Sequence, residues 1–331
     1  MFDGKNVLIT GGSGSLGIAL TKKLLELNVE TVRIYSRNES KQLEMQNQVS
    51  DSRIRFLIGD VRDLSRLSMA MEKIDIVIHA AALKHVPVVE YNPFEAIKTN
   101  ILGTQNVIEA CLNENVETAV CIGTDKAVAP YNTYGATKHL MERLFVTASN
   151  YLNPERHKTR FICVRYGNVL GSSGSVIPKF IEQVKSGKKI SITEPSMTRF
   201  NITMNQALTL IFKSIKNGYG GEVFVPKLKA YRLDILKDVI LDLLNSNTSI
   251  EKIPVRPGEK FHESLISFDE LRNTFENDEN YIIVDEKSQD KILKKWKNLK
   301  PTSLNDQYSS NKVEILTKDQ LKQILLEENL L

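Results

Sequence analysis

The chain is poor in three features, each of which would point to a particular class of protein. Its three cysteines, Cys111, Cys121 and Cys163, form an odd and scattered set. They exclude a disulfide framework and are typical of reduced core residues. There is no CxxC pair, and His262-Glu263 lacks the second histidine of a zinc-binding helix, so we expect no metal. No stretch approaches the roughly 18 uninterrupted apolar residues of a membrane-spanning helix.

The chain also lacks an excess of charge of one sign. Lysine and arginine number 44 against 40 aspartate and glutamate residues, and the net charge of +4 is spread along the sequence. This balance gives no electrostatic case for a nucleic-acid partner. The sequence begins on an apolar strand pattern without a basic and apolar leader, so we predict a cytoplasmic protein with no membrane partner.

The amino terminus carries a dinucleotide-binding fingerprint. Residues 6–10 predict an apolar strand, a glycine-rich loop follows at once, and leucines at helical spacing come next. Glycine allows the tight turn and the close approach of a pyrophosphate, and the helix amino terminus offers unpaired N–H groups. The predicted cofactor contacts in this loop are Gly11, Ser13, Gly14, Ser15, Leu16 and Gly17.

The second predicted strand ends in Ser36-Arg37, where an NAD enzyme normally has an acidic residue for the ribose hydroxyls. A serine and an arginine suit a 2′-phosphate, so the sequence favours NADP over NAD. The alternative is that Arg37 is only a solvated loop residue. Further cofactor contacts are predicted where the third and fourth strands end, at Asp60, Val61, Ala80, Ala81 and Ala82.

Strand and helix patterns alternate from residue 5 to about 168, with strands near 5, 31, 54, 75, 117 and 160. This rhythm predicts an α/β fold with a doubly wound parallel Rossmann sheet. We expect residues 1–168 and about 205–227 to form the NADP-binding domain. Residues 169–204 and 228–331 are expected to form a smaller α+β lobe for the substrate.

A cluster of chemically active residues follows the fifth strand. Thr124, Asp125 and Lys126 end an apolar run, and Tyr134 and Lys138 lie four apart on a predicted helix. In open α/β sheets ligands bind at strand carboxyl ends, and an ammonium beside a phenol lowers the phenol's pKa. Spacing alone proves little, because residues 308 and 312 repeat it in a polar stretch without a preceding strand. The competing interpretation of residues 125–126 is a surface turn with a weak ion pair.

Six separated motifs carry a resemblance over nearly the whole chain. They are residues 59–63 (GDVRD), 80–87 (AAALKHVP), 92–106 (NPFEAIKTNILGTQN), 124–127 (TDKA), 197–200 (MTRF) and 256–263 (RPGEKFHE). The chain resembles the extended short-chain dehydrogenase/reductases, and within them the inverting UDP-N-acetylglucosamine 4,6-dehydratases, which begin pseudaminic acid synthesis. One departure is Gly123, where that family usually has serine.

The resemblance implies a role for each residue of the cluster. Tyr134, supported by Lys138, takes the C4 hydroxyl proton as hydride passes to NADP, and Thr124 orients that hydroxyl. Lys126 removes the C5 proton and Asp125 protonates the departing C6 hydroxyl. These two roles require a neutral amine and a protonated carboxyl, so we expect a desolvated pocket that shifts both pKa values.

The resemblance also implies contacts and partners. The resemblance implies that the substrate is UDP-N-acetylglucosamine or a related nucleotide sugar. It also implies a homo-oligomer, such as a hexamer. Arginine suits the pyrophosphate, and a glutamate can accept hydrogen bonds from ribose. Lys84 and Asn100 are further cofactor candidates. The substrate candidates are Lys84, His85, Asn168, Arg199, Arg256 and Glu259.

Two other functions fit parts of the pattern. A UDP-sugar C4 or C5 epimerase uses the same scaffold and differs in that its product has not lost water. A non-catalytic NADP-binding regulator belongs to a different class and would be expected to lack the tyrosine or the lysine, but both are present.

Overall fold

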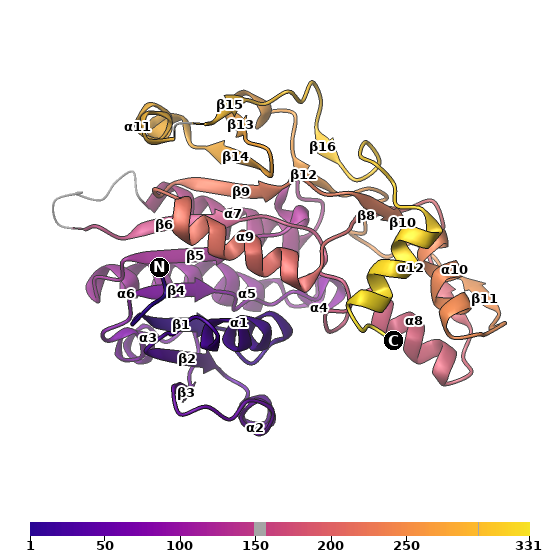
Figure 1. Ribbon diagram of the computed structural model, residues 1–331, viewed down its shortest axis with the longest axis horizontal. Coiled ribbons are helices and arrows are strands. Elements are labelled where there is room, and N and C mark those ends of the chain that lie inside the picture. The colour runs from indigo at the N-terminus through magenta and orange to yellow at the C-terminus, as the bar shows by residue number, and fades with distance from the viewer. Residues whose placement is uncertain (149–156, 297) are drawn as a thin grey trace.

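A computed structural model describes residues 1–148, 157–296 and 298–331. Its main body is a sheet with helices on both faces (Figure 1). Seven neighbouring strands run parallel, and the order across the sheet is β3 (Ile54–Ile58), β2 (Thr31–Ser36), β1 (Asn6–Thr10), β4 (Ile76–His79), β5 (Thr118–Ile122), β6 (Arg160–Val164) and β9 (Glu222–Pro226). The predicted parallel Rossmann sheet is confirmed.

Apolar side chains on both sides of each strand explain the doubly wound arrangement, because a buried parallel sheet must be covered on both faces. Val7 and Ile9 of β1 pack into one core, while Leu8 between them packs into the other. The first core is covered by α1 (Ser15–Leu25), α2 (Glu39–Gln48) and α9 (Met204–Asn217). The second is covered by α3 (Leu64–Met71), α6 (Gly103–Asn113) and α7 (Thr133–Ala148).

Three antiparallel strands extend the sheet beyond β9. They are β14 (Asn280–Val284), β13 (Thr274–Glu276) and β15 (Lys300–Pro301). The sequence-based division had assigned all of residues 228–331 to the substrate lobe, and for 274–301 the strand pairing corrects it. The physical reason is that β14 is buried along its whole length against β9, a partner that is not its neighbour in sequence. The α11 helix (Gln289–Lys295) lies in the connection between β14 and β15.

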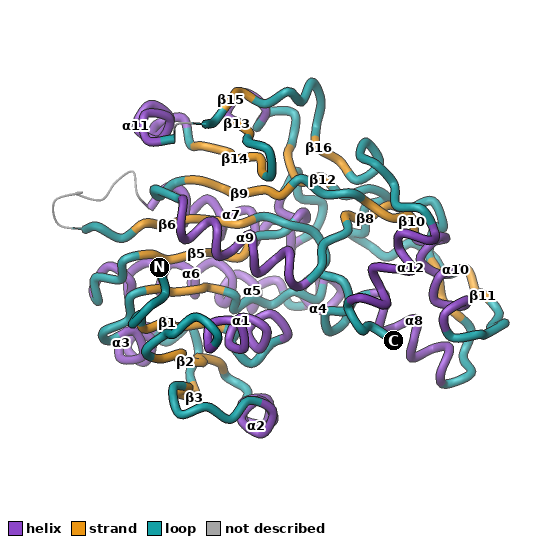
Figure 2. Tube along the Cα trace, in the orientation of Figure 1, coloured by secondary structure: helices purple, strands orange, loops and turns teal. Residues whose placement is uncertain are grey.

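A smaller lobe lies beside the sheet, next to α4 (Val86–Tyr91), which follows β4 (Figures 1 and 2). Its core is formed by the apolar faces of α8 (Val176–Lys185), α10 (Leu233–Leu243) and α12 (Lys318–Glu327). Short strand pairs complete it: β8 (Thr198–Phe200) with β10 (Ala230–Arg232), and β7 (Ile190–Ile192) with β11 (Ile250–Lys252). A third pair, β12 (Ser264–Ile266) with β16 (Tyr308–Ser309), joins the lobe to the sheet region.

Short irregular helices complete the description. They are α5 (Pro93–Ala96), a π-helical turn η1 (Ile97–Leu102) that runs into α6, and the 3₁₀ turns η2 (Asp125–Ala127), η3 (Leu271–Asn273) and η4 (Glu286–Ser288). Among the helices of residues 1–148, 157–296 and 298–331, none combines the length and apolarity that a membrane crossing needs.

Candidate active site

Two adjoining clefts open where the parallel strands end. The first, here called the glycine-loop cleft, is lined by the loop after β1 and by the residues that follow β2, β3, β4 and β5. The second, the lobe cleft, lies between residues 124–134 and the smaller lobe. Both clefts are lined by Thr124 and Tyr134, together with Lys84, His85, Asn168 and Ser172.

The glycine loop has the shape that a dinucleotide requires. Gly11 has φ +69°, and a Cβ there would lie 2.9 Å from backbone atoms of Ala81. A Cβ on Gly17 would lie 2.2 Å from the carbonyl oxygen of Gly12, so α1 can pack this closely only with glycine. Gly14, the residue before α1, has no side chain that could accept hydrogen bonds from the start of the helix. The first N–H groups of α1 are therefore available to an anion.

The far end of this cleft holds the residues predicted to choose between NADP and NAD. The Ser36 hydroxyl lies 2.9 Å from the Ser13 hydroxyl and accepts a hydrogen bond from Gln42 Nε2 at 2.9 Å. Arg37 is half-exposed, with Nη1 3.6 Å from Asp60 Oδ2, and Lys41 lines the same end. Two cationic side chains therefore lie at this end of the cleft.

The glycine-loop cleft collects the predicted cofactor residues with a single exception. Asn100, in η1, is fully buried and lines neither cleft. Its Oδ1 accepts a hydrogen bond from Leu83 N at 2.8 Å, and its Nδ2 donates to Leu83 O at 3.1 Å and to Thr137 Oγ1 at 3.0 Å. Asn100 therefore fixes the backbone that forms the cleft wall. The residues that do line it as predicted are Gly11, Ser13, Gly14, Ser15, Leu16, Gly17, Ser36, Arg37, Asp60, Val61, Ala80, Ala81, Ala82, Lys84, Tyr134 and Lys138.

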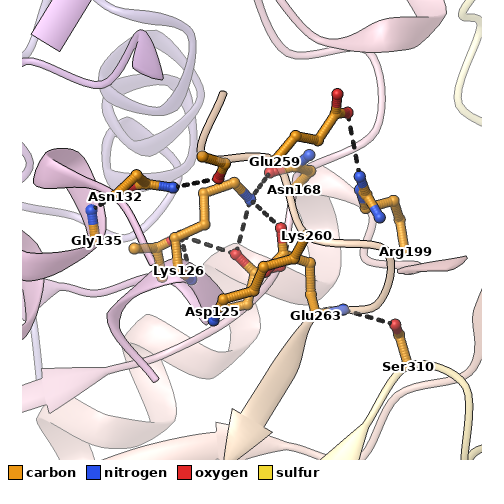
Figure 3. A network of polar contacts seen from close by, with 12 residues as sticks. Asp125, Lys126, Asn132, Gly135, Asn168, Arg199, Glu259, Lys260, Glu263 and Ser310 are labelled. Atoms are coloured by element: carbon orange, nitrogen blue, oxygen red, sulfur yellow. Dashed lines mark hydrogen bonds and ion pairs between the residues drawn. The ribbon is translucent and has the colours of Figure 1, made fainter. Parts of the chain in front are cut away.

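The acid and amine after β5 lie on the 3₁₀ turn η2, which begins after Thr124 (Figure 3). Lys126 Nζ is surrounded by three oxygens: Asp125 Oδ1 at 3.0 Å, Asn168 Oδ1 at 3.2 Å and Glu263 Oε1 at 3.4 Å. Asp125 Oδ1 also accepts a hydrogen bond from Thr124 Oγ1 at 3.0 Å. The surface-turn interpretation is wrong, because Asp125 is fully buried and Lys126 faces the lobe cleft.

The charge state of Lys126 differs from the neutral amine that its proposed role requires. Burial lowers its pKa, but the carboxylates of Asp125 and Glu263 outweigh burial, and the pKa of Lys126 is raised. The folded protein therefore holds an ammonium ion at this position. Asp125 itself is buried and lines neither cleft, and it contacts Lys126, which lines the lobe cleft.

The predicted coupling between Tyr134 and Lys138 is also corrected. Both residues lie on α7 and are buried, as expected. However, burial raises the pKa of Tyr134 to about 12, opposed by Lys126 and by a hydrogen bond with Thr124. The Lys138 ammonium donates to Ile122 O at 2.5 Å and to Met141 Sδ at 3.1 Å, and burial lowers its pKa. The cation that lowers the pKa of the phenol is Lys126, whereas the Lys138 side chain turns toward β5.

The predicted substrate residues all line the lobe cleft: Lys84, His85, Asn168, Arg199, Arg256 and Glu259. Arg199 Nη2 lies 3.3 Å from Glu259 Oε1, and Arg199 Nη1 is held by Thr198 O and Phe261 O. Lys84 Nζ donates to Ser173 O at 2.9 Å, which links the wall after β4 to the loop before α8.

Sequence reasoning missed three charged residues, of which Lys179 and Glu263 line this cleft and Lys260 lies close to the acid–amine cluster. Lys179, on α8, faces Arg256, which helps to lower its pKa after burial. Lys260 donates to Val128 O at 2.7 Å and faces the acid–amine cluster, and Glu263 pairs with Lys126. Lys260 and Glu263 belong to the 256–263 motif, so the motif was visible, but nothing in it showed which members turn toward Lys126.

Comparisons with known proteins agree with this geometry. The polysaccharide biosynthesis protein family matches residues 7–285. The inverting UDP-N-acetylglucosamine 4,6-dehydratase of Campylobacter jejuni is 47% identical over 285 residues, covering 86% of this chain and 84% of that protein. A UDP-glucose 4-epimerase of Rickettsia conorii is 38% identical over 332 residues, covering 98% and 96%.

A solved structure extends the match to three dimensions. The X-ray structure of Pen from Bacillus thuringiensis is 40% identical, covers all of both chains and superposes with a TM-score of 0.94. These matches confirm the resemblance stated from the motifs. The chain belongs to the polysaccharide biosynthesis protein family, within the sugar-nucleotide dehydratases and epimerases of the extended short-chain dehydrogenase/reductases.

Proposed function

We propose that this chain is an inverting UDP-N-acetylglucosamine 4,6-dehydratase that uses NADP. The observation that carries the proposal is the placement of Thr124 and Tyr134 on the wall shared by both clefts, with Lys126 beside them on the lobe side. A sugar in the lobe cleft therefore meets hydroxyl, phenol and amine next to the glycine-loop cleft. The 47% identity to a dehydratase of that name supports the choice of reaction.

The residues of the chain divide the work as follows. Tyr134 accepts the proton of the C4 hydroxyl, and Thr124, which hydrogen-bonds both Tyr134 and Asp125, orients that hydroxyl. Lys126 accepts the C5 proton, which the adjacent 4-ketone makes acidic, and Asp125 donates a proton to the departing C6 hydroxyl. A bound NADP supplies the hydride acceptor for C4 and the hydride donor for C6.

These roles require a change from the ligand-free charge state. Lys126 is an ammonium ion between carboxylates here, and a base must be neutral. Passing one proton from Lys126 Nζ to Asp125 Oδ1, 3.0 Å away, produces the neutral amine and the protonated acid together. A bound sugar that displaces water favours this neutral pair over the ion pair.

The preference for NADP is supported by Arg37 and Lys41 at the end of the glycine-loop cleft and by Ser36-Arg37 at the end of β2, where an NAD enzyme normally has an acidic residue. Arg37→Asp should weaken NADP binding by tenfold or more and spare NAD, because it removes one cation from the 2′-phosphate. Equal losses for both cofactors, measured by fluorescence titration, would contradict the preference.

Three finer points remain predictions. They are a cytoplasmic location, a homo-oligomer such as a hexamer, and use of the product in pseudaminic acid synthesis. Each is implied by the resemblance.

The second candidate is a UDP-sugar epimerase. It is favoured by one observation, the near full-length similarity to a protein named UDP-glucose 4-epimerase. Tyr134, Thr124 and a cofactor are sufficient for C4 epimerisation, so the Asp125–Lys126 pair distinguishes the two reactions. A silent binding protein is not favoured, since Tyr134 and Lys138 are both present in the cleft.

The test is incubation of the purified protein with UDP-N-acetylglucosamine without added cofactor, followed by mass spectrometry and proton NMR in D₂O. Loss of one water, corrected for deuterium, with a 4-keto product inverted at C5 supports the dehydratase. An unchanged mass with a new sugar configuration would instead show the epimerase.

A further inference from the structure

Glu263 is a buried glutamate whose side chain faces the lobe cleft from outside the β5 cluster. It lies just before β12, and its side chain is 3% exposed. Its backbone is fixed by β16 and the residue after it: Glu263 N donates to Ser310 Oγ at 3.0 Å, and Ser310 N donates to Glu263 O at 2.8 Å. This double attachment holds the carboxyl at a set position (Figure 3).

The carboxyl group of Glu263 is only half used. Its Oε1 lies 3.4 Å from Lys126 Nζ. Its Oε2 is buried and has no hydrogen-bond partner in the described part of the chain, and the same is true of Asp125 Oδ2. Two buried carboxyls therefore share one ammonium, and a second negative charge in so dry a place is costly unless one carboxyl gains a proton.

We propose that Glu263 is a positioning residue that sets the charge of Lys126: an ionised Glu263 holds Lys126 as ammonium, and a protonated Glu263 allows it to become a neutral amine. The inference rests on the proposed role of Lys126 as the base. In that state Glu263 has taken up a proton from solvent, which forms one O–H bond. The proton that Lys126 then loses passes to Asp125 Oδ1, as the proposed acid role of Asp125 requires, so one N–H bond breaks and a second O–H bond forms.

The groups facing Glu263 are arranged for such an exchange. Lys126 and Asp125 approach from η2, Arg199 from β8 and Lys260 from the same loop, and Tyr134 of α7 also senses its charge. Burial raises the pKa of Glu263, opposed by the three cations and reinforced by Asp125. The pKa of the Glu263 carboxyl is thus higher than that of an exposed glutamate.

The experiment is a titration of Lys126 itself in the ligand-free protein. With lysine labelled at the ε-carbon, the NMR signal of Lys126 is identified by its loss in Lys126→Arg. The pKa is then compared between the unmodified protein and Glu263→Gln, Glu263→Asp and Glu222→Gln. Glu222 is the matched control, a fully buried glutamate that accepts hydrogen bonds from Tyr219 N and Gly220 N at the far side of the sheet.

We expect Lys126 to remain charged up to the alkaline limit of the folded protein and Glu263→Gln to lower its pKa by about one to three units, since a carboxylate at this distance has that effect. Neutral amine at a given pH then rises about 10- to 1000-fold. Glu263→Asp should give a smaller shift, and Glu222→Gln none. An unchanged titration in a folded Glu263→Gln protein overturns the proposal.

Two further results keep the conclusions separate. If Glu263→Gln does not fold, Glu263→Asp decides, because a pKa of Lys126 equal to that of the unmodified protein contradicts the proposal. If the unmodified protein fails to dehydrate the sugar, the proposed function falls while the titration still decides the role of Glu263. In an active enzyme, the acidic limb of the pH–rate profile should move to lower pH in Glu263→Gln.

Discussion

Individual side chains carry the chemistry, and Lys126 shows how far their behaviour depends on surroundings. Two carboxylates and an amide oxygen surround its ammonium, and together they overcome the burial that favours the neutral form. A lysine in an apolar pocket would behave in the opposite way. The reactivity of this residue is therefore set by Asp125 and Glu263, which can change its charge by moving a single proton.

Replacing Lys126 by alanine removes the proposed C5 base and leaves Tyr134 and Thr124 in place. We expect dehydration to fall by at least 10³-fold while slow C4 oxidation persists, because the two steps use different groups. Absorbance of the reduced nicotinamide in the bound cofactor reports oxidation, and mass spectrometry reports loss of water. Normal dehydration in this variant would refute the assignment of Lys126 as base.

The tyrosine–lysine spacing shows what residue patterns can and cannot predict. Tyr134 and Lys138 line the glycine-loop cleft. The residues that repeat the spacing have ordinary structural roles: Tyr308 lies in β16 and donates to Leu228 O at 3.0 Å, and Lys312 pairs with Asp306. The preceding strand and glycine loop thus mark the pair that lines this cleft. The direction of the Lys138 side chain was not predictable, since it depends on a carbonyl of β5.

Strands, loops and helices place these side chains. Where β1 leads into α1, the surrounding backbone leaves no room for a side chain at Gly11 or Gly17. Gly11 and Gly4 both have positive φ values, +69° and +64°, but only Gly11 has backbone within reach of a Cβ. A side chain at Gly4 would therefore test the effect of a positive φ alone. A side chain at Gly11 would test the same effect together with a clash against the backbone of Ala81.

Gly11→Ala should weaken binding of the dinucleotide at least tenfold and lower the unfolding free energy by about 1–3 kcal/mol, because the loop must move away from Ala81. Gly4→Ala is the control and should leave cofactor affinity unchanged. Affinity is measured by titration calorimetry and stability by urea unfolding. Equal effects of the two substitutions on cofactor binding would contradict a steric role for Gly11.

His79 connects three elements at the end of β4. Its Nδ1 lies 2.7 Å from Thr10 Oγ1 of β1, and its Nε2 lies 3.0 Å from Thr104 Oγ1 of α6. Burial, aided by Lys138, lowers the pKa of His79 to about 3. The folded protein therefore keeps this histidine neutral at any pH at which the enzyme is expected to work.

This shift predicts a pH dependence of stability. Above the unfolded-state pKa of about 6.5, His79 is neutral in both states and its contribution to the unfolding free energy is fully present. Below that pH the unfolded chain gains a proton at His79 that the folded protein does not, so the folded state loses stability. Between pH 7 and pH 5 its contribution to the unfolding free energy should fall by about 2 kcal/mol. Urea unfolding of the unmodified protein and His79→Gln measures it, and an identical pH dependence in both would contradict the shift.

Across the whole molecule, the sheet and the loop that carries Glu263 are tied together by a buried charge cluster. Arg165, after β6, is 1% exposed, and its Nη2 pairs with Glu142 of α7 and with Glu270 Oε1 at 2.7 Å. Its Nη1 also donates to Leu265 O at 2.8 Å, in β12. The cluster therefore links the end of β6 and the α7 helix with the segment that continues from Glu263.

Arg165→Gln should lower the unfolding free energy by about 3–5 kcal/mol, since it leaves Glu142 buried without its cation. Lys23→Gln, which breaks an exposed pair with Glu26, is the control and should cost less than about 1 kcal/mol. Both are measured by urea unfolding at pH 7. A loss as small as that of the control would show that water replaces Arg165.

Much of the architecture followed from local pattern. The apolar strands, the glycine loop and the helix that carries Tyr134 and Lys138 were each predicted, because their apolar periodicity and glycines lie within a few positions. Residues 274–301 were assigned to the wrong part of the molecule. Their strands are short and gain their stability by pairing with β9, a contact that no local pattern records.

Local sequence patterns alone located two features: a strand–glycine–helix unit, and an acid and an amine at the end of another strand. Both could be predicted because each depends on residues that are close together in the sequence. The charge on Lys126, the direction of Lys138, the buried position of Asp125 and the approach of Glu263 followed from packing between distant segments. Desolvation and Coulomb interactions depend on what surrounds a group in space, and the order of residues does not contain that information.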